Sequence, residues 1–242
     1  NEEPLSTGFL KETTQNTLYT CSKDELKPAL NGVSLSFGAS SVTAVSTDGH
    51  RLVRFIYQQN NPKPKTVIIP QKFLNIVSSG TINTKKAQLQ VSENYIRIKT
   101  ENQTLSTRLI TEKFPDYENV IPKELENTTT IKTKDFLGAI KRVSLMSNKT
   151  TKQIILNITT NKIVFSAEDH ETGGSATEEI VVEHKGKECT IGFNSTLLVE
   201  ILKHQKTEEI EFLTSGALSA TLIKQKGEEQ TETTTLLMPI RI

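Results

Sequence analysis

SVTAVSTDGHRLVRFIYQ, residues 41–58, carries the clearest structural signal in this chain. Apolar and polar residues alternate over residues 41–46 and again over residues 51–58, a pattern typical of strands with one buried face. Asp48 and Gly49 lie between the two runs and favour a tight turn, because glycine adopts a positive φ without steric cost. The stretch therefore predicts an antiparallel hairpin.

Similar alternating runs recur at short intervals along the whole chain, rich in threonine and β-branched residues. In the first half they cover residues 29–37, 87–91, 95–100 and 105–110. In the second half they cover residues 153–159, 162–168, 176–183, 209–213, 218–224 and 233–238. Short alternating runs of this kind predict half-buried strands in antiparallel sheets.

Each half also contains two segments with the apolar spacing of amphipathic helices, residues 6–20 and 71–79, then 134–147 and 195–204. Both halves have the order helix, three strands, short strand leading into a helix, further strands. Phe9 then aligns with Phe136, and Phe73 with Leu197, at nearly the same offset, which indicates an internal duplication. We expect an α+β fold of two tandem repeats, residues 1–122 and 123–242, each with two helices packed on antiparallel sheets.

The composition excludes several classes of protein. No run approaches the roughly 18 apolar residues of a membrane helix, and a net charge of +1 argues against a generally basic nucleic-acid binder. Cys21 and Cys189 are far apart and lack metal-like spacing, so we expect two free thiols and neither a disulfide nor a metal. No cofactor is expected. The chain starts with neither a methionine nor an apolar signal segment, as a cytoplasmic protein or a trimmed chain would.

Two other classes of function stay open at this point. Asn-x-Ser/Thr sequons begin at Asn102, Asn127, Asn148, Asn157 and Asn194, and would suit a secreted β-rich adhesion module. A chain this rich in asparagine and threonine contains several by chance. Asp48 and His50 could form the acid/base couple of a hydrolase, but no nucleophile, metal cluster or phosphate loop accompanies them.

Two further segments are informative. FPDYENVIP, residues 114–122, is a linker stiffened by two prolines. LLMPIRI, residues 236–242, is apolar, although chain ends are usually polar and frayed. Such a tail must complete a sheet or line a hydrophobic surface for a partner. Pro239 would end a strand, leaving Ile240 and Ile242 outside the ladder.

Taken in this order, the Thr-Asp-Gly-His-Arg-Leu turn, the Phe-Pro-Asp-Tyr linker and the Met-Pro-x-Arg tail resemble the β subunit of bacterial DNA polymerase III, the sliding clamp. Leu30-Asn31-Gly32 also matches, and the resemblance covers essentially the whole chain. It implies a non-catalytic, cytoplasmic processivity factor with a DNA clamp fold. Family members have three copies of the domain, and two protomers form a head-to-tail ring with helices lining the hole. This chain is similar to the second and third copies, without the first.

The resemblance also implies a hydrophobic groove between these two domains, which binds short linear motifs of the polymerase III catalytic subunit, the clamp loader, and translesion and repair proteins. Asn119 departs from the arginine of some relatives, which puts its polar contacts in doubt. The groove residues carried over are Leu30, Thr47, Gly49, His50, Arg51, Leu52, Pro115, Asn119, Val120, Ser219, Leu236, Leu237, Met238, Pro239, Ile240 and Arg241.

The family resemblance further implies that double-stranded DNA passes along the helices without base readout, so that cations meet phosphates loosely. Pro28 and Ala29 stand where some relatives have DNA-contacting tyrosines, so that contact is absent here. The cations expected to face DNA are Lys11, Lys72, Lys134, Lys141, Arg142, Lys149, Lys152 and Lys203.

Overall fold

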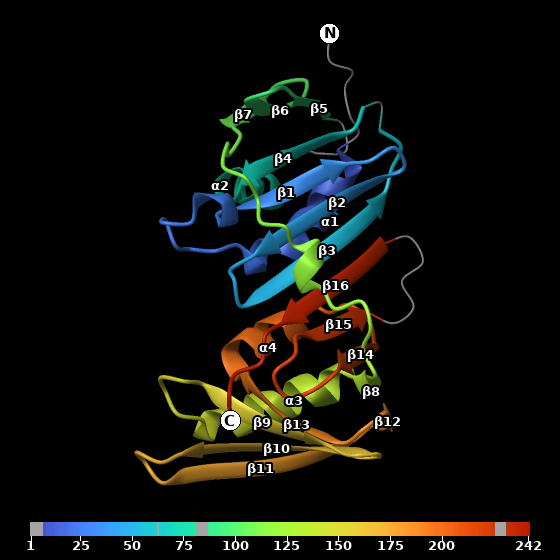
Figure 1. Cartoon of the computed structure of the whole chain (residues 1–242). Coiled ribbons are helices and arrows are strands. Elements are labelled where there is room, and N and C mark those ends of the chain that lie inside the picture. Colours follow the sequence, from blue (N-terminus) through green and yellow to red (C-terminus); the bar gives the residue numbers. More distant parts are fainter. Residues whose placement is uncertain (1–6, 62, 81–86, 226–230) are drawn as a thin grey trace. The chain divides into compact units, whose positions relative to one another are not determined.

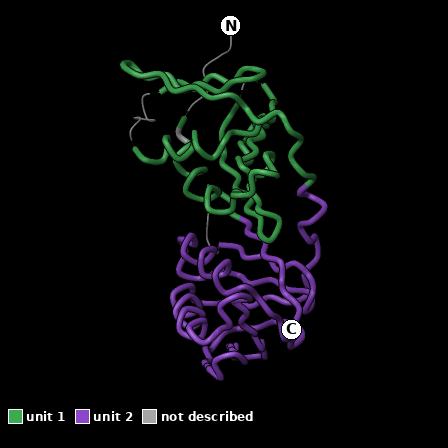
Figure 2. Tube along the Cα trace, turned by 90° about the vertical axis from the view of Figure 1, so that its left-hand side faces the viewer, with its two compact units in different colours: residues 1–116, 229–233 green, residues 117–228, 234–242 purple. Residues whose placement is uncertain are grey.

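A computed structural model describes residues 7–61, 63–80, 87–225 and 231–242 of the chain. The chain divides into two compact units, residues 1–116 with 229–233 and residues 117–228 with 234–242 (Figure 2). Among the described residues, no helix has both the length and the apolar character needed to cross a bilayer.

Unit 1 begins with a helix and carries its second helix directly after a strand (Figure 1). A four-stranded sheet has the order β3-β2-β1-β4, and a second sheet has the order β5-β6-β7. The elements are α1 (Gly8–Thr17), β1 (Gly32–Phe37), β2 (Ser41–Thr47), β3 (Arg51–Gln58), β4 (Lys65–Pro70), α2 (Gln71–Ser78), β5 (Gln88–Val91), β6 (Tyr95–Lys99) and β7 (Thr104–Arg108).

Unit 2 repeats this plan with two added strands. Its elements are β8 (Asn127–Lys132), α3 (Thr133–Val143), β9 (Gln153–Ile158), β10 (Lys162–Asp169), β11 (Gly174–Val181), β12 (Glu183–Lys185), β13 (Cys189–Asn194), α4 (Ser195–Lys203), β14 (Glu209–Thr214), β15 (Thr221–Gln225) and β16 (Thr231–Leu237), of which the residues from Thr234 on belong to unit 2.

The strand orders confirm the internal duplication. One sheet of unit 2 has the order β11-β10-β9-β13, which reproduces β3-β2-β1-β4 of unit 1 strand for strand. The last strand in each of these orders, β4 or β13, leads directly into the second helix of its unit. Three further strands follow in both units. Phe9 and Phe136, the aligned phenylalanines of α1 and α3, are both fully buried. The predicted α+β fold of two tandem repeats is therefore correct.

The predicted hairpin is present. Strands β2 and β3 pair antiparallel, with Thr47 opposite Leu52, and Gly49 has a φ of 93° in the turn between them. A β-carbon is disfavoured at that φ, which accounts for the glycine.

Several predicted boundaries are wrong for identifiable reasons. The strand expected from residue 29 begins at Gly32, because Pro28–Leu30 form a 3-10 turn in which the Leu30 N–H donates to the Lys27 carbonyl oxygen. Strand β8 was not predicted. Its buried positions include Asn127 and Thr129, which count as polar and therefore hide the alternating pattern. The helix expected to reach residue 147 ends at Val143, so Leu145 is 78% exposed instead of forming part of the apolar stripe. Ser6, at the start of the first expected helix, lies outside the described residues.

The core of unit 2 joins its two sheets through α3, which runs between them in Figure 1. The ring of Phe136 lies 5.7 Å from that of Phe165 in β10 and 5.5 Å from that of Phe212 in β14, centroid to centroid. Phe193 of β13 extends the cluster, 5.9 Å from Phe212. Asn194 caps α4, because its side-chain oxygen accepts from the Thr196 and Leu197 N–H groups.

Replacing Phe136 with alanine should lower the free energy of unfolding by about 3–5 kcal/mol, because it opens a cavity where the two sheets meet. Chemical denaturation of the purified chain measures this loss. The control Leu145→Ala, on an exposed side chain, should change stability by no more than about 0.5 kcal/mol. Equal losses in the two variants would contradict the assigned core.

Candidate functional site

The turn at residues 48–51 is organised by one carboxylate. Asp48 Oδ1 accepts from the N–H groups of His50 (2.9 Å) and Arg51 (3.0 Å), and Oδ2 accepts from Arg51 Nε at 3.0 Å. The Thr47 hydroxyl donates to the Arg51 carbonyl oxygen at 2.7 Å. These bonds hold the Asp48 carboxylate to its own turn. His50 is exposed and faces solvent at the tip.

Arg51 fastens this turn to the segment that follows α1. Its side chain is buried, at 6% exposure, where its NH2 group donates to the Tyr19 carbonyl oxygen at 2.8 Å and its guanidinium lies 5.4 Å from the centre of the Tyr19 ring. The Ser46 hydroxyl, at the end of β2, donates to the Thr17 carbonyl oxygen at 2.6 Å. The exposed tip, Gly49 and His50, is thus presented on a rigid base.

The predicted groove residues of unit 1 divide into buried and exposed ones. Leu30, Thr47 and Leu52 are buried, whereas Pro115 is exposed. In unit 1 the described structure therefore leaves Gly49, His50 and Pro115 as the members that a partner can reach directly.

Both cysteines are free, as expected. Burial, together with the nearby charge of Asp48, raises the pKa of the Cys21 thiol to about 12. Burial also raises the pKa of Cys189, against a hydrogen bond with Thr214. Both thiols are therefore protonated at neutral pH and are poor nucleophiles. Within the described residues, no group of three or more His, Cys, Asp or Glu side chains could hold a metal ion.

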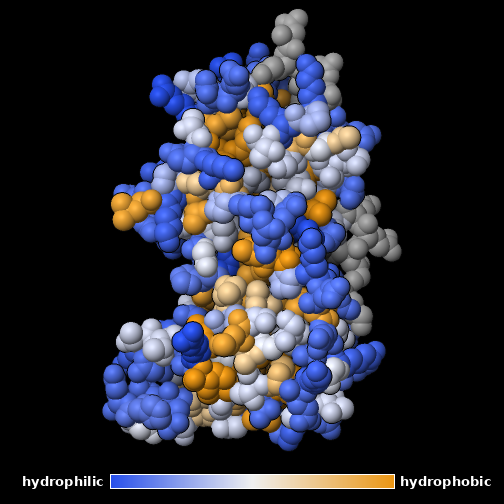
Figure 3. Space-filling view, in the orientation of Figure 1, coloured by the Kyte–Doolittle hydropathy of each residue, from blue (hydrophilic) through white to orange (hydrophobic). Residues whose placement is uncertain are grey.

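In unit 2 the linker and the tail each present apolar surface. Val120 lies in a 3-10 turn, Glu118–Val120, and is 52% exposed, and its neighbour Asn119 is also exposed. Met238 directly follows β16 and is 42% exposed. Ser219 is exposed in the loop before β15, where its N–H donates to the Gly216 carbonyl oxygen. In Figure 3, a patch of hydrophobic surface lies near the place marked C in Figure 1, beside hydrophilic surface.

The tail itself is held in place. Leu236 and Leu237 end β16 with their side chains in the core, so they position the tail and are covered. Strand β16 ends at Leu237, so Ile240 lies outside its ladder as expected, but the Ile240 N–H donates to the Gly192 carbonyl oxygen at 2.9 Å in an isolated antiparallel bridge to β13. Pro239 and Ile240 are half-buried, and Arg241 is exposed.

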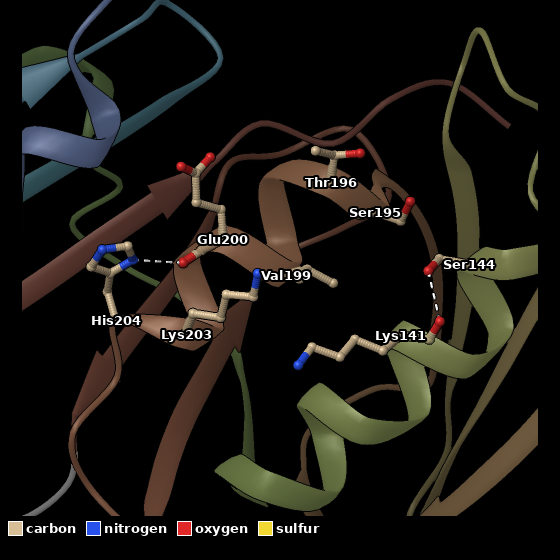
Figure 4. A pocket seen from close by; sticks show the side chains of 8 residues that line it. All are labelled: Lys141, Ser144, Ser195, Thr196, Val199, Glu200, Lys203 and His204. Carbon is tan, nitrogen blue, oxygen red and sulfur yellow. Dashed lines mark hydrogen bonds between the residues drawn. The ribbon is translucent and has the colours of Figure 1, made fainter.

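The predicted DNA-facing cations divide into groups. Lys141 of α3 and Lys203 of α4 line one cleft of about 460 Å³, with their side chains directed into it (Figure 4). Glu200, Ser195 and Val199 are among its other lining residues. The helices also carry further exposed lysines, Lys134 on α3, Lys11 on α1 and Lys72 on α2. Lys149 and Lys152 belong instead to the turn after α3.

Arg142 is not a free member of this set. Its Nε and NH2 groups donate to both Glu178 oxygens, at 2.9 and 2.5 Å. This fork raises the pKa of Arg142 and lowers that of Glu178, chiefly through the hydrogen bonds. The arginine is thus directed onto β11, and Glu178 already balances its charge, which weakens its attraction for a phosphate.

Two residues that seat the tail, Gly192 and Gln153, were missed in the sequence. Gln153 Nε2 donates to the Arg241 carbonyl oxygen at 3.3 Å. A glycine inside a strand often marks a place where another backbone comes close, so Gly192 carried a usable signal. The sequence alone did not identify which segment approaches it.

Two family models match consecutive parts of this chain. Residues 4–116 match the central domain of the DNA polymerase III beta subunit, and residues 118–241 match the C-terminal domain of the same subunit.

Curated relatives and solved structures agree with these matches. The chain is 28% identical over 242 residues to the beta sliding clamp of Haemophilus influenzae, covering 98% of this chain and 65% of that protein. It therefore spans just under two thirds of the length of that relative. The sliding clamp structures of Pseudomonas aeruginosa (TM-score 0.93, 24% identity) and Bacillus subtilis (TM-score 0.91, 26% identity) cover all of this chain, which covers 67% and 64% of theirs.

Replacing Arg51 with lysine should destabilise the chain by about 1–3 kcal/mol, because one ammonium group cannot reproduce the fork that reaches both Asp48 and Tyr19. Denaturant unfolding measures the loss. The matched control is Arg97→Lys, on the exposed face of β6, which should be neutral within about 0.5 kcal/mol. If both variants were equally stable, the anchoring role of Arg51 would be refuted.

Proposed function

This chain belongs to the DNA polymerase III beta subunit family, and from that membership we propose that it is part of a DNA sliding clamp, a processivity factor that tethers polymerases to duplex DNA. The observation that carries the proposal is the match to two consecutive clamp domains, in order, over residues 4–116 and 118–241. We propose residues 1–122 and 123–242 as the two domains, with linker residues 117–122, which cluster with unit 2 in the structure, assigned to the first.

The clamp acts in this proposal without catalysis, in the cytoplasm. Asp48, the carboxylate that could have served a hydrolase, is bonded to its own turn and to Arg51. Family membership leaves no support for a secreted adhesion module. A tether needs surfaces that bind partners and DNA, and the exposed apolar tail and the lysine-lined helix face supply chemistry suited to both.

Partner proteins would bind through short linear motifs with apolar anchors. In unit 2 the tail exposes the apolar side chains of Met238 and Ile242, and the linker turn exposes that of Val120. In unit 1 the rigid turn at Gly49 and His50 is the second proposed contact. Burying apolar anchors gains about 25 cal/mol per Å², and we expect micromolar affinity for an isolated peptide, about −8 kcal/mol. Weak contacts of this kind allow the polymerase, the clamp loader and repair proteins to exchange.

Duplex DNA would contact the helix face that carries Lys141 and Lys203. Their side chains are flexible and directed into a shared cleft, so they can follow a moving phosphate backbone without reading bases. This chemistry suits a sliding contact, which must be loose and independent of sequence.

A homodimeric ring formed by the longer protein would need a surface that pairs with another copy. Strand β11 is an eight-residue edge strand, with Val181 at its end and Leu145 and Met146 exposed after α3. Unpaired strand edges and exposed apolar side chains are typical of surfaces that pair with another chain. We assign this edge to the contact between protomers.

Replacing Met238 with alanine should weaken binding of a peptide carrying the clamp-binding motif of a replicative polymerase about tenfold, because an apolar anchor contact is lost. Isothermal titration calorimetry on the full chain measures this. Val181→Ala removes an exposed apolar side chain at the end of β11, outside the tail, and should leave the affinity unchanged. Unaltered peptide affinity in the Met238 variant would rule out the tail as the peptide site.

Replacing Lys141 or Lys203 with alanine should weaken binding to a short DNA duplex at low salt. The slope of log affinity against log salt should fall by about one for each lysine that meets a phosphate. Fluorescence anisotropy of a labelled duplex provides the measurement. Arg142→Ala should have a smaller effect, because that guanidinium is bound to Glu178, and Lys187→Ala, in the loop after β12, should have none. A slope that is the same in every variant would exclude the helix face.

A further inference from the structure

Gly192 occupies a position in β13 where its backbone does not require glycine. Its φ is not among the positive values found at Gly49, Gly80, Gly173, Gly186 and Gly216. It is buried, and it pairs with Ile155 of the neighbouring strand β9 in regular antiparallel register. Any β-branched residue would suit the strand better. The absence of a side chain at residue 192 must therefore leave room for a segment that packs on this face of the strand.

The C-terminal tail fills that space. A β-carbon on Gly192 would lie 2.9 Å from the Ile240 carbonyl oxygen, 3.0 Å from Ile242 Cγ1 and 3.4 Å from Ile240 Cγ1. In addition, the Ile240 N–H donates to the Gly192 carbonyl oxygen at 2.9 Å. The tail thus crosses β13 directly over this glycine, at a distance that only hydrogen permits.

A second contact fixes the end of the tail. Gln153 of β9 donates its side-chain amide to the Arg241 carbonyl oxygen at 3.3 Å. Ile242 lines a cleft of about 680 Å³ together with Gln153 and Ile155. Residues 238–242 therefore form a strap, anchored on one side by β16 and on the other by β13 and β9.

We propose that Gly192 is a positioning residue for the partner-binding surface: it seats the strap, and the strap sets the place of Met238 and Arg241. The inference rests on the proposed function of the tail. Pro239 joins Met238 to Ile240 and fixes one of the two soft torsions at that residue. A displacement of Ile240 is therefore transmitted to Met238, which is 42% exposed and proposed to contact the partner peptide.

A methyl group at residue 192 would move the strap in preference to the strand. The close contact is with a backbone oxygen, which cannot rotate away as a side chain can. The strand is paired with β9 along its whole length, whereas the described tail after β16 makes one backbone bridge, at Ile240. Local opening occurs where few hydrogen bonds hold the backbone.

The test uses the full chain with Gly192→Ala and the control Gly38→Ala, whose added carbon would lie 3.4 Å from the Ser41 carbonyl oxygen, an ordinary contact. Hydrogen exchange of the Ile240 amide should accelerate about tenfold in the Gly192 variant and stay unchanged in the control. Affinity for the polymerase-motif peptide should fall about fivefold or more, while the melting temperature shifts little, because the strap lies outside the core.

A truncated background separates positioning from a general loss of structure. In a chain that lacks residues 240–242, Gly192→Ala should have no further effect on peptide affinity, because the segment that it displaces is gone. An equal loss in both backgrounds, or unchanged Ile240 exchange in the intact chain, overturns the inference. Failure of the unmodified chain to bind the peptide overturns the proposed function instead, whatever the exchange shows about the strap.

Gln153→Ala provides a second route if Gly192→Ala folds poorly. It removes the hydrogen bond to the Arg241 carbonyl oxygen and leaves β13 untouched. Faster exchange of the Ile240 amide together with weaker peptide binding supports the strap, and faster exchange with unchanged binding refutes its role in recognition.

Discussion

The contact of Phe136 with Phe165 and Phe212 is the interaction on which two of the proposed surfaces of unit 2, the lysine face and the tail, depend. It places α3 against both sheets, so that the buried side of the helix is fixed and Lys141 is left on the outside. Phe212 also packs against Phe193 in β13. Because side chains alternate along a strand, Phe193 points into the core and Gly192 points to the other face, under the tail. One aromatic cluster therefore orients the lysine face and the seat of the strap together.

The polar residues of the turn illustrate how a sequence can suggest chemistry where the structure uses the same groups for support. Asp48 and His50 are close in sequence, as an acid/base couple can be. In the structure the carboxylate is satisfied by two N–H groups and the Arg51 guanidinium, and Arg51 extends to the backbone of Tyr19. Burying an arginine is costly unless it is paired and hydrogen-bonded, so Asp48 is needed for Arg51 to lie there. The tip that remains exposed is rigid, which suits recognition.

Periodicity was enough to predict the hairpin and the duplication, because both follow from local pattern and from order along the chain. The errors arise where contacts distant in sequence decide the outcome. Strand β8 is hidden in the sequence because polar residues, Asn127 and Thr129, occupy two of its three buried positions, and Leu145 has helical spacing although the helix ends before it. Arg142 looks like any cation on a helix until Glu178, far along the chain, binds it. The bridge between Ile240 and Gly192 is of the same kind, since no local pattern relates a strand glycine to a tail nearly 50 residues later.

Five residues that follow a strand and belong to no regular element are often mobile, and a mobile segment must lose its freedom when a partner binds. Ordering each side chain at an interface costs about 0.5–1.5 kcal/mol, which is a large fraction of the affinity expected for a short motif. A strap that Gly192 and Gln153 already hold in place has lost much of this conformational entropy during folding. Few contacts hold the strap: one backbone bridge and one side-chain hydrogen bond. Holding it therefore does not require a large apolar surface to be buried. A weak but ordered site suits the proposed exchange of partners: order would keep each motif specific, and a small contact area would keep each complex short-lived.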